Sequence, residues 1–172
     1  MVKISKLIPN IFTLLNLTFA IISIVYSINK NFNFAIIFII LSVIFDAFDG
    51  FLAKKLNATS KLGKELDSLS DLISFGLAPS IMLMSYFSYN FIIVFVSIFF
   101  ILTSELRLAR YNISKASKGF EGLPTTASGL LIVIYVFLLV NSFLPDSSLL
   151  TSVILFILGL AQISRIKVKR VL

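Results

Sequence analysis

The chain has 172 residues, of which 58% are hydrophobic and only 13% are charged. A soluble domain carries about twice this share of charged residues, so the composition predicts an all-α protein that crosses a membrane several times. The net charge is +7, but the basic residues lie in short blocks between apolar segments, a pattern of membrane topology and not of nucleic-acid binding. Because cysteine and histidine are absent, disulfides, thiol catalysis and the usual zinc and copper sites are excluded.

Uncharged segments long enough to span a bilayer follow one another along the chain. The longest, residues 72–104, would measure about 50 Å as one helix, which is too long for a bilayer core of about 30 Å. We therefore expect a break within Ser85–Asn90, and further boundaries near Pro124 and at the turn Pro145-Asp146. The whole chain, residues 1–172, is expected to form one domain of six transmembrane helices: 7–29, 31–56, the two parts of 72–104, 122–145 and 147–164.

The distribution of basic residues predicts the orientation of these helices. All 15 lysines and arginines except Lys30 fall on one side of the predicted membrane domain. Since basic residues are retained on the cytoplasmic side, we expect both termini in the cytoplasm of a multi-pass plasma-membrane protein. The acidic segment described next is then expected to open toward the cytoplasm.

Four aspartates stand out between residues 46 and 71, because carboxylates are costly inside apolar helices and indicate function there. Asp46 and Asp49 are spaced i, i+3, and Asp67 and Asp71 are spaced i, i+4, so each pair lies on one face of its helix. If the chain folds back at the polar residues 57–60, Asp49 faces Asp67 and Asp46 faces Asp71. All four carboxylates then meet at one depth.

Four carboxylates this close cannot all stay ionised without cations between them. Oxygen ligands suit Mg²⁺ or Mn²⁺, and Ca²⁺ is a further possible occupant. Four acids are enough to hold two ions, as in two-metal phosphoryl-transfer sites. Two other interpretations remain open: ion pairs with the lysines near the turn (Lys54, Lys55, Lys61 and Lys64), and a divalent-cation transporter.

The spacing of these residues resembles the signature of the CDP-alcohol phosphatidyltransferase family, D-x2-D-G-x2-A-R-x8-G-x3-D-x3-D. Every fixed position matches except Lys54, where the signature has arginine. Members of this family have six transmembrane helices and are usually dimeric, so the resemblance implies a homodimer in the lipid bilayer. Three other segments resemble the phosphatidylserine synthase branch: Pro9-Asn10-x-x-Thr13-x-x-Asn16, Arg107-Leu-Ala-Arg110-Tyr-Asn112 and Phe120-Glu-Gly-Leu-Pro124.

The resemblance implies a reaction in which a CDP-lipid, CDP-diacylglycerol or CDP-archaeol, transfers its lipid phosphate to the hydroxyl of L-serine and releases CMP. It implies that two divalent cations are held by all four aspartates, and that Asp71 is also the general base. It places five residues near the CDP-lipid: Asn10, Thr13, Gly50, Lys54 and Ser60.

The acceptor site is a separate hypothesis, drawn from residue chemistry. Arg107 and Arg110 are spaced i, i+3 and are candidates to bind the carboxylate of serine, with Glu105 or Glu121 for its ammonium group. Glycerol 3-phosphate and inositol phosphate remain alternative acceptors. A phosphorylated acceptor calls for a denser basic pocket, which favours serine.

Overall fold

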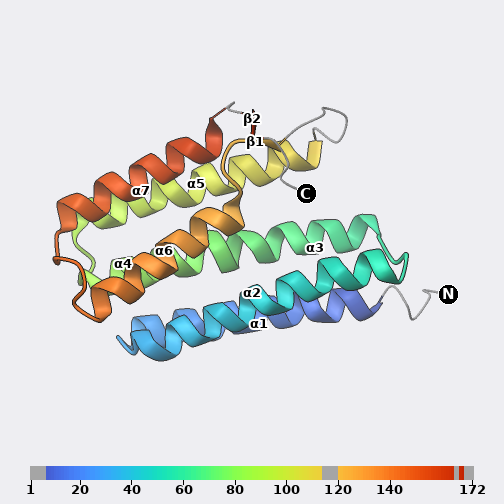
Figure 1. The fold of residues 1–172 in the computed structure, drawn as a ribbon, viewed down its shortest axis with the longest axis horizontal. Coiled ribbons are helices and arrows are strands. Elements are labelled where there is room, and N and C mark those ends of the chain that lie inside the picture. Colours follow the sequence, from blue (N-terminus) through green and yellow to red (C-terminus); the bar gives the residue numbers. More distant parts are fainter. Residues whose placement is uncertain (1–6, 114–119, 165–166, 169–172) are drawn as a thin grey trace.

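The structure, a computed structural model, describes residues 7–113, 120–164 and 167–168 as a bundle of helices (Figure 1). The expected helix 31–56 is observed as Phe32–Lys55, whereas the two parts of 72–104 extend further than expected, back to Lys61 and on to Ile113. The helices are α1 (Leu7–Ile28), α2 (Phe32–Lys55), α3 (Lys61–Asp71), the π-helical segment η2 (Leu72–Leu77), α4 (Ala78–Tyr86), α5 (Phe91–Ile113), α6 (Thr125–Val140) and α7 (Ser148–Ile163).

Helices α1 and α2 form an antiparallel hairpin along one side of the bundle (Figure 1). A row of aromatic rings joins them, with ring centroids 5.0 Å apart for Phe19 and Phe45 and 5.3 Å apart for Tyr26 and Phe38. Stacked and tilted ring pairs at these distances add to the burial of apolar area. These ring pairs therefore hold α2, which carries Asp46 and Asp49, against α1.

Helices α3, η2 and α4 form one continuous helical rod from Lys61 to Tyr86. The rod ends where the sequence predicted a break: Ser88 and Tyr89 have positive φ angles of 49° and 57°, and α5 starts at Phe91. The π-helical segment directly after Asp71 was not predicted. Such segments occur frequently at functional sites.

Helix α6 crosses close to the π-helical segment because Gly129 has no side chain. A Cβ on Gly129 would lie 2.5 Å from the backbone oxygen of Phe75 and 2.8 Å from its Cα. The backbones of α6 and η2 therefore pack directly on each other, as small residues permit in membrane helix bundles. Helix α7 packs along α5.

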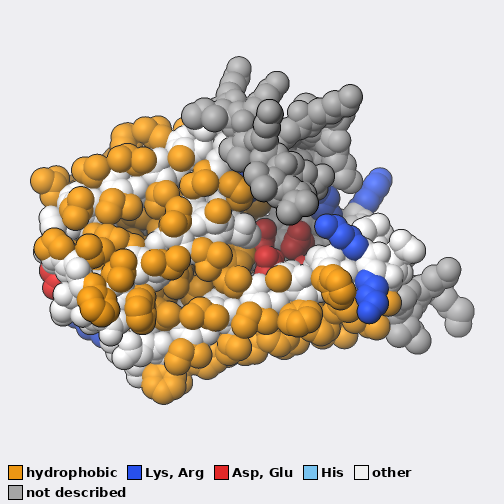
Figure 2. All heavy atoms as spheres, in the orientation of Figure 1, with side chains coloured by type: hydrophobic (Ala, Val, Ile, Leu, Met, Phe, Trp, Pro, Cys, Tyr) orange, Lys and Arg blue, Asp and Glu red, His pale blue; other side chains and the backbone are white. Residues whose placement is uncertain are grey.

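The all-α class is confirmed, with one small addition: β1 (Phe120–Glu121) and β2 (Lys167–Val168) pair as an antiparallel two-residue ladder. Among the described residues, four helical segments are long and apolar enough to cross a membrane: α1, α2, the rod from α3 to α4, and α5. Helices α6 and α7 are apolar but shorter, with 16 residues each. Figure 2 shows the corresponding surface, which is hydrophobic over most of the visible face.

Contacts place several helix ends at one end of the bundle. The start of α3 meets the start of α1, where Gly63 faces Asn10, and Lys64 donates a hydrogen bond to the carbonyl of Asn112 near the end of α5. The end of α7 joins them, since Arg110 donates to the carbonyl of Ile163. The end of α2 belongs to the same region, because Lys54 lines one pocket with Asn10 and Lys61. The described basic residues apart from Lys30 and that of β2 lie on the ends of α2 and α5 and the start of α3.

Candidate functional site

Three of the four aspartates come together between α2 and α3. Asp46, Asp49 and Asp67 each offer one carboxylate oxygen such that the three oxygens lie within 4.8 Å of one another. Asp71 is outside this group of three, but its carboxyl group lies close enough to that of Asp46 to interact with it electrostatically. The structure thus brings the aspartates together as their spacing predicted. Their role as metal ligands stays a prediction.

The electrostatic state of this cluster is unusual, because two buried carboxylate oxygens lack partners. Within the described part of the chain, Oδ2 of Asp49 and Oδ1 of Asp71 accept no hydrogen bond. A buried carboxylate left in this state is costly unless a cation or proton satisfies it. An oxygen-rich set of acids with unsatisfied acceptors fits a hard divalent cation.

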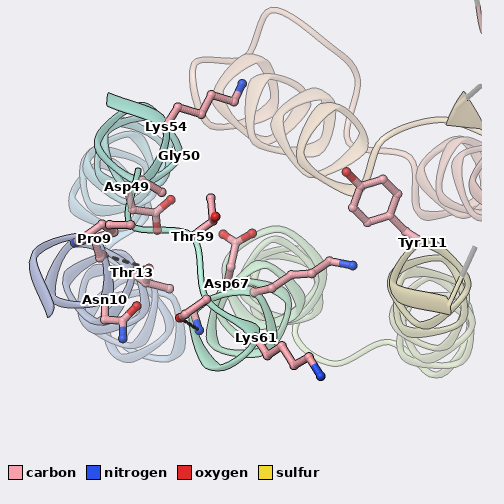
Figure 3. Close-up of a pocket in the computed structure, with 15 residues that line it drawn as sticks. Pro9, Asn10, Thr13, Asp49, Gly50, Lys54, Thr59, Lys61, Asp67 and Tyr111 are labelled. Carbon is pink, nitrogen blue, oxygen red and sulfur yellow. Dashed lines mark hydrogen bonds between the residues drawn. The ribbon is translucent and has the colours of Figure 1, made fainter. Parts of the chain in front are cut away.

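The nearby lysines do not replace such a cation. Figure 3 shows Lys54 and Lys61 extending away from Asp49 and Asp67, and both lysines are exposed. Lys64 lies within electrostatic range of Asp67, but its Nζ donates to the Asn112 carbonyl at 3.5 Å and lies 5.2 Å from the centre of the Tyr111 ring. One lysine at the edge cannot balance four carboxylates, which argues against the ion-pair interpretation.

A pocket of about 630 Å³ opens beside the aspartates (Figure 3). It is formed by the start of α1, the end of α2, the α2–α3 turn and the start of α3. Asp49 and Asp67 line it, and so do all five residues that the family resemblance assigns to the CDP-lipid: Asn10, Thr13, Gly50, Lys54 and Ser60. Figure 2 shows acidic side chains recessed in a hollow of the surface, with basic side chains toward the same end.

Two of these five residues have local structural roles as well. Ser60 caps α3, since its hydroxyl accepts a hydrogen bond of 2.9 Å from the backbone N–H of Gly63. Thr13 is buried, donates to the carbonyl of Pro9 at 3.1 Å, and contacts the carboxylate of Asp49. Both residues therefore shape the pocket wall whether or not they touch a ligand.

Gly63 determines which helix α3 packs against. Helices α2 and α3 make little direct contact, and α3 packs on α1 instead. A Cβ on Gly63 would lie 2.9 Å from Oδ1 of Asn10 and 3.1 Å from Oγ of Ser60. The glycine therefore allows α3 to approach α1, which leaves the space between α2 and α3 open for the aspartates.

The candidate acceptor residues on α5 fall into three different settings. Arg107 is half-buried; one terminal guanidinium nitrogen donates to Oγ1 of Thr125 at 3.0 Å, while its buried Nε has no partner among the described residues. Arg107 also lies within electrostatic range of Asp71. Arg110 is exposed and donates to the carbonyl of Ile163. None of these three residues lines the pocket described above. Glu105 is exposed two residues away from Arg107, on another side of α5, and the side chain of Glu121 lies outside the described residues.

Sequence reasoning left Asn16 without a role, although it noted the residue in the first helix. Asn16 is fully buried, and its amide donates a hydrogen bond of 3.3 Å to Oδ1 of Asp46. Its side-chain oxygen accepts hydrogen bonds from Ser42 and Ser74. The signal available in the sequence was its spacing from Asn10 and Thr13 on one face of α1.

Comparison with known proteins agrees with this arrangement. The sequence model of the CDP-alcohol phosphatidyltransferase family matches residues 6–163. The chain is 40% identical over 137 residues to a CDP-diacylglycerol–serine O-phosphatidyltransferase of Helicobacter pylori, a match that covers 77% of this chain and 58% of that protein. It is 39% identical over 155 residues to the protein of the same name in Methanocaldococcus jannaschii, with 90% and 70% of the two chains covered.

An archaetidylserine synthase of Methanothermobacter thermautotrophicus is 37% identical over 128 residues, which are 72% of this chain and 55% of that protein. The chain thus spans between about half and 70% of the length of these three relatives. The family match nevertheless extends over nearly all of the chain and includes the four aspartates and the pocket. This chain belongs to the CDP-alcohol phosphatidyltransferase family.

Proposed function

We propose that this protein transfers a phosphatidyl or archaetidyl group from CDP-diacylglycerol or CDP-archaeol to the hydroxyl of L-serine and releases CMP. One observation carries the proposal: the pocket that holds Asp49 and Asp67 is lined by every residue expected to contact the CDP-lipid. The names of the relatives, which include both phosphatidylserine and archaetidylserine synthases, support serine as the acceptor and leave either lipid as donor.

Asp46, Asp49, Asp67 and Asp71 hold two divalent cations, Mg²⁺ or Mn²⁺, in this proposal. The unsatisfied Oδ2 of Asp49 fits that role. When bound, divalent cations neutralise the diphosphate and stabilise the charge that passes to the leaving CMP. Asn10, Thr13, Gly50, Lys54 and Ser60 bind the CDP part of the lipid. Lys54 offers a point charge in place of the planar fork of arginine.

Asp71 acts as the general base. Its Oδ1 is buried and accepts no hydrogen bond from the described residues, so it is available to take the proton of the attacking hydroxyl. The hydroxyl oxygen then attacks the phosphorus that bears the lipid, and the bond to the CMP oxygen breaks. Arg107 binds the serine carboxylate beside this base, since its Nε–H is buried without a partner in the described chain and Asp71 is near.

The proposal also includes six membrane spans and an active site that faces the cytoplasm. The four long helices and the shorter α6 and α7 make six spans, with the pocket at the end of the bundle that carries most of the described basic residues. Basic residues favour the cytoplasmic side, so both termini and the active site face the cytoplasm in the plasma membrane. The protein works as a homodimer, as the family resemblance implies.

The test is the release of CMP by the purified protein in detergent or liposomes. CDP-diacylglycerol and CDP-archaeol are each supplied with serine, glycerol 3-phosphate or inositol phosphate in parallel. We expect CMP release with serine, and none from an Asp67→Asn variant. CMP release with another acceptor but not with serine would reject serine as the acceptor. Divalent-cation flux through sealed liposomes without any CMP release would reject the proposed enzymatic function in favour of a transporter.

A further inference from the structure

Asn16 links the helix that carries Asp46 to the helix that carries Asp71. It lies on α1, with a relative exposure of 0%, and contacts three groups on two other elements. Its Nδ2 donates to Oδ1 of Asp46 on α2 at 3.3 Å. Its Oδ1 accepts from the hydroxyl of Ser42 on α2 and from the hydroxyl of Ser74, in the π-helical segment, at 2.7 Å.

The carboxylate of Asp46 and the two serines together define the direction in which the amide of Asn16 points. A side-chain amide oxygen has two lone pairs, and here both receive a hydroxyl proton. The NH₂ group faces Asp46, whose ionised carboxylate can only accept a hydrogen bond. The opposite orientation of the amide would turn its oxygen toward a carboxylate and remove the donor that Asp46 uses, which is unfavourable in a buried site.

We propose that Asn16 is a positioning residue for the metal centre, and that Ser42 and Ser74 hold its amide in the donating orientation toward Asp46. This inference rests on the proposed function only for the presence of a divalent cation. With Oδ1 of Asp46 held by the amide, the carboxylate keeps one fixed orientation beside Asp49 and Asp67. Hydrogen-bond partners of metal ligands commonly alter metal affinity by about 10- to 100-fold when they are removed.

The hydrogen bonds of Asn16 also influence the spacing of the helices, because of the position of Ser74. Ser74 lies three residues after Asp71, in the segment where the rod is π-helical. Its bond to Asn16 ties this segment to α1, while Ser42 and Asp46 tie α2 to the same side chain. Since α2 and α3 make little direct contact, the separation between the two aspartate pairs is set through α1.

A purely structural role for Asn16 makes a different prediction. Polar side chains between membrane helices can stabilise the bundle without any effect on a bound ion. In that case, removal of the amide lowers the thermal stability of the protein and leaves metal affinity unchanged. The buried Ser23 provides a matched control on the same helix, because its hydroxyl also bridges to α2, donating to the Ala35 carbonyl at 2.7 Å, away from the aspartates.

The experiment measures Mn²⁺ binding to the purified protein without substrate, by electron paramagnetic resonance titration, alongside the thermal unfolding midpoint. The variants are Asn16→Ala, Ser42→Ala, Ser74→Ala and the control Ser23→Ala, with Asp46→Asn as the reference for loss of a ligand. The single serine variants remove only one of the two bonds to the amide oxygen, so they keep the test valid if Asn16→Ala fails to fold.

We expect about a tenfold or larger increase in the Mn²⁺ dissociation constant for Asn16→Ala, a smaller increase for each serine variant, and no change for Ser23→Ala. Mn²⁺ affinity within twofold of the parent protein in the Asn16 and serine variants, with weakened binding in Asp46→Asn, would overturn the inference. So would the absence of Mn²⁺ binding by the parent protein. Normal Mn²⁺ binding with no CMP release would reject the proposed reaction while the inference about Asn16 stands.

Discussion

Replacement of Gly50 by alanine distinguishes an effect on protein stability from an effect on substrate binding. Gly50 lies in the last third of α2, and a Cβ built there meets no atom within 4 Å. It lines the pocket beside Asp49 (Figure 3). The fold therefore has no steric reason for glycine at this position, whereas close approach of a substrate to the helix backbone would require one.

The two effects have opposite signs and measurable sizes. Alanine in place of glycine inside a helix stabilises it by about 0.5–1 kcal/mol, or roughly 1–4 °C in the thermal midpoint for a chain of this size. A methyl group in the path of the CDP-lipid displaces the substrate by ~1 Å, and such a displacement costs about 100-fold in rate. This loss corresponds to about 2.7 kcal/mol of transition-state stabilisation.

The assay compares kcat/KM for CDP-lipid with thermal unfolding of the same preparation. Gly129→Ala is the matched control, because its Cβ would lie 2.5 Å from the Phe75 backbone oxygen, and overpacking against backbone costs about 1–3 kcal/mol or more. We expect Gly50→Ala to be stable and nearly inactive, and Gly129→Ala to lose stability. Full activity in a stable Gly50→Ala protein would refute the reasoning that the pocket holds the nucleotide part of the substrate against α2.

Three further predictions concern the chemistry of the site. Asp71→Asn should reduce kcat by at least about 100-fold, while CDP-lipid still binds and Mn²⁺ still binds at the other three aspartates; a fully active variant would remove Asp71 as the base. A chelator should stop CMP release, and added Mg²⁺ or Mn²⁺ should restore it; activity that persists in excess chelator would contradict the metal requirement. Arg107→Lys should raise the KM for serine about tenfold with the KM for CDP-lipid unchanged, and an equal rise in both constants would show that Arg107 does not recognise serine.

The sequence alone determined the features that depend on local patterns. Charge-free runs longer than a bilayer core predicted the long helices, and the polar residues 85–90 predicted the break before α5, which the structure confirms. The aspartates could be found because an acid in an apolar helix is rare and its i, i+3 or i+4 spacing assigns it to one helix face. Their meeting between α2 and α3 followed from a turn at residues 57–60.

Contacts between helices distant in the chain were decided only by the tertiary structure. Gly63 packs on Asn10 and not on α2, Asn16 links Asp46 to Ser74, and Arg107 binds Thr125 across to α6. Serines, glycines and asparagines occur throughout membrane helices, and their partners lie tens of residues away, so periodicity carries no information about which of them meet. The charged residues of the site could therefore be identified from the sequence. The neutral side chains that position them could be identified only from the packing of the helices.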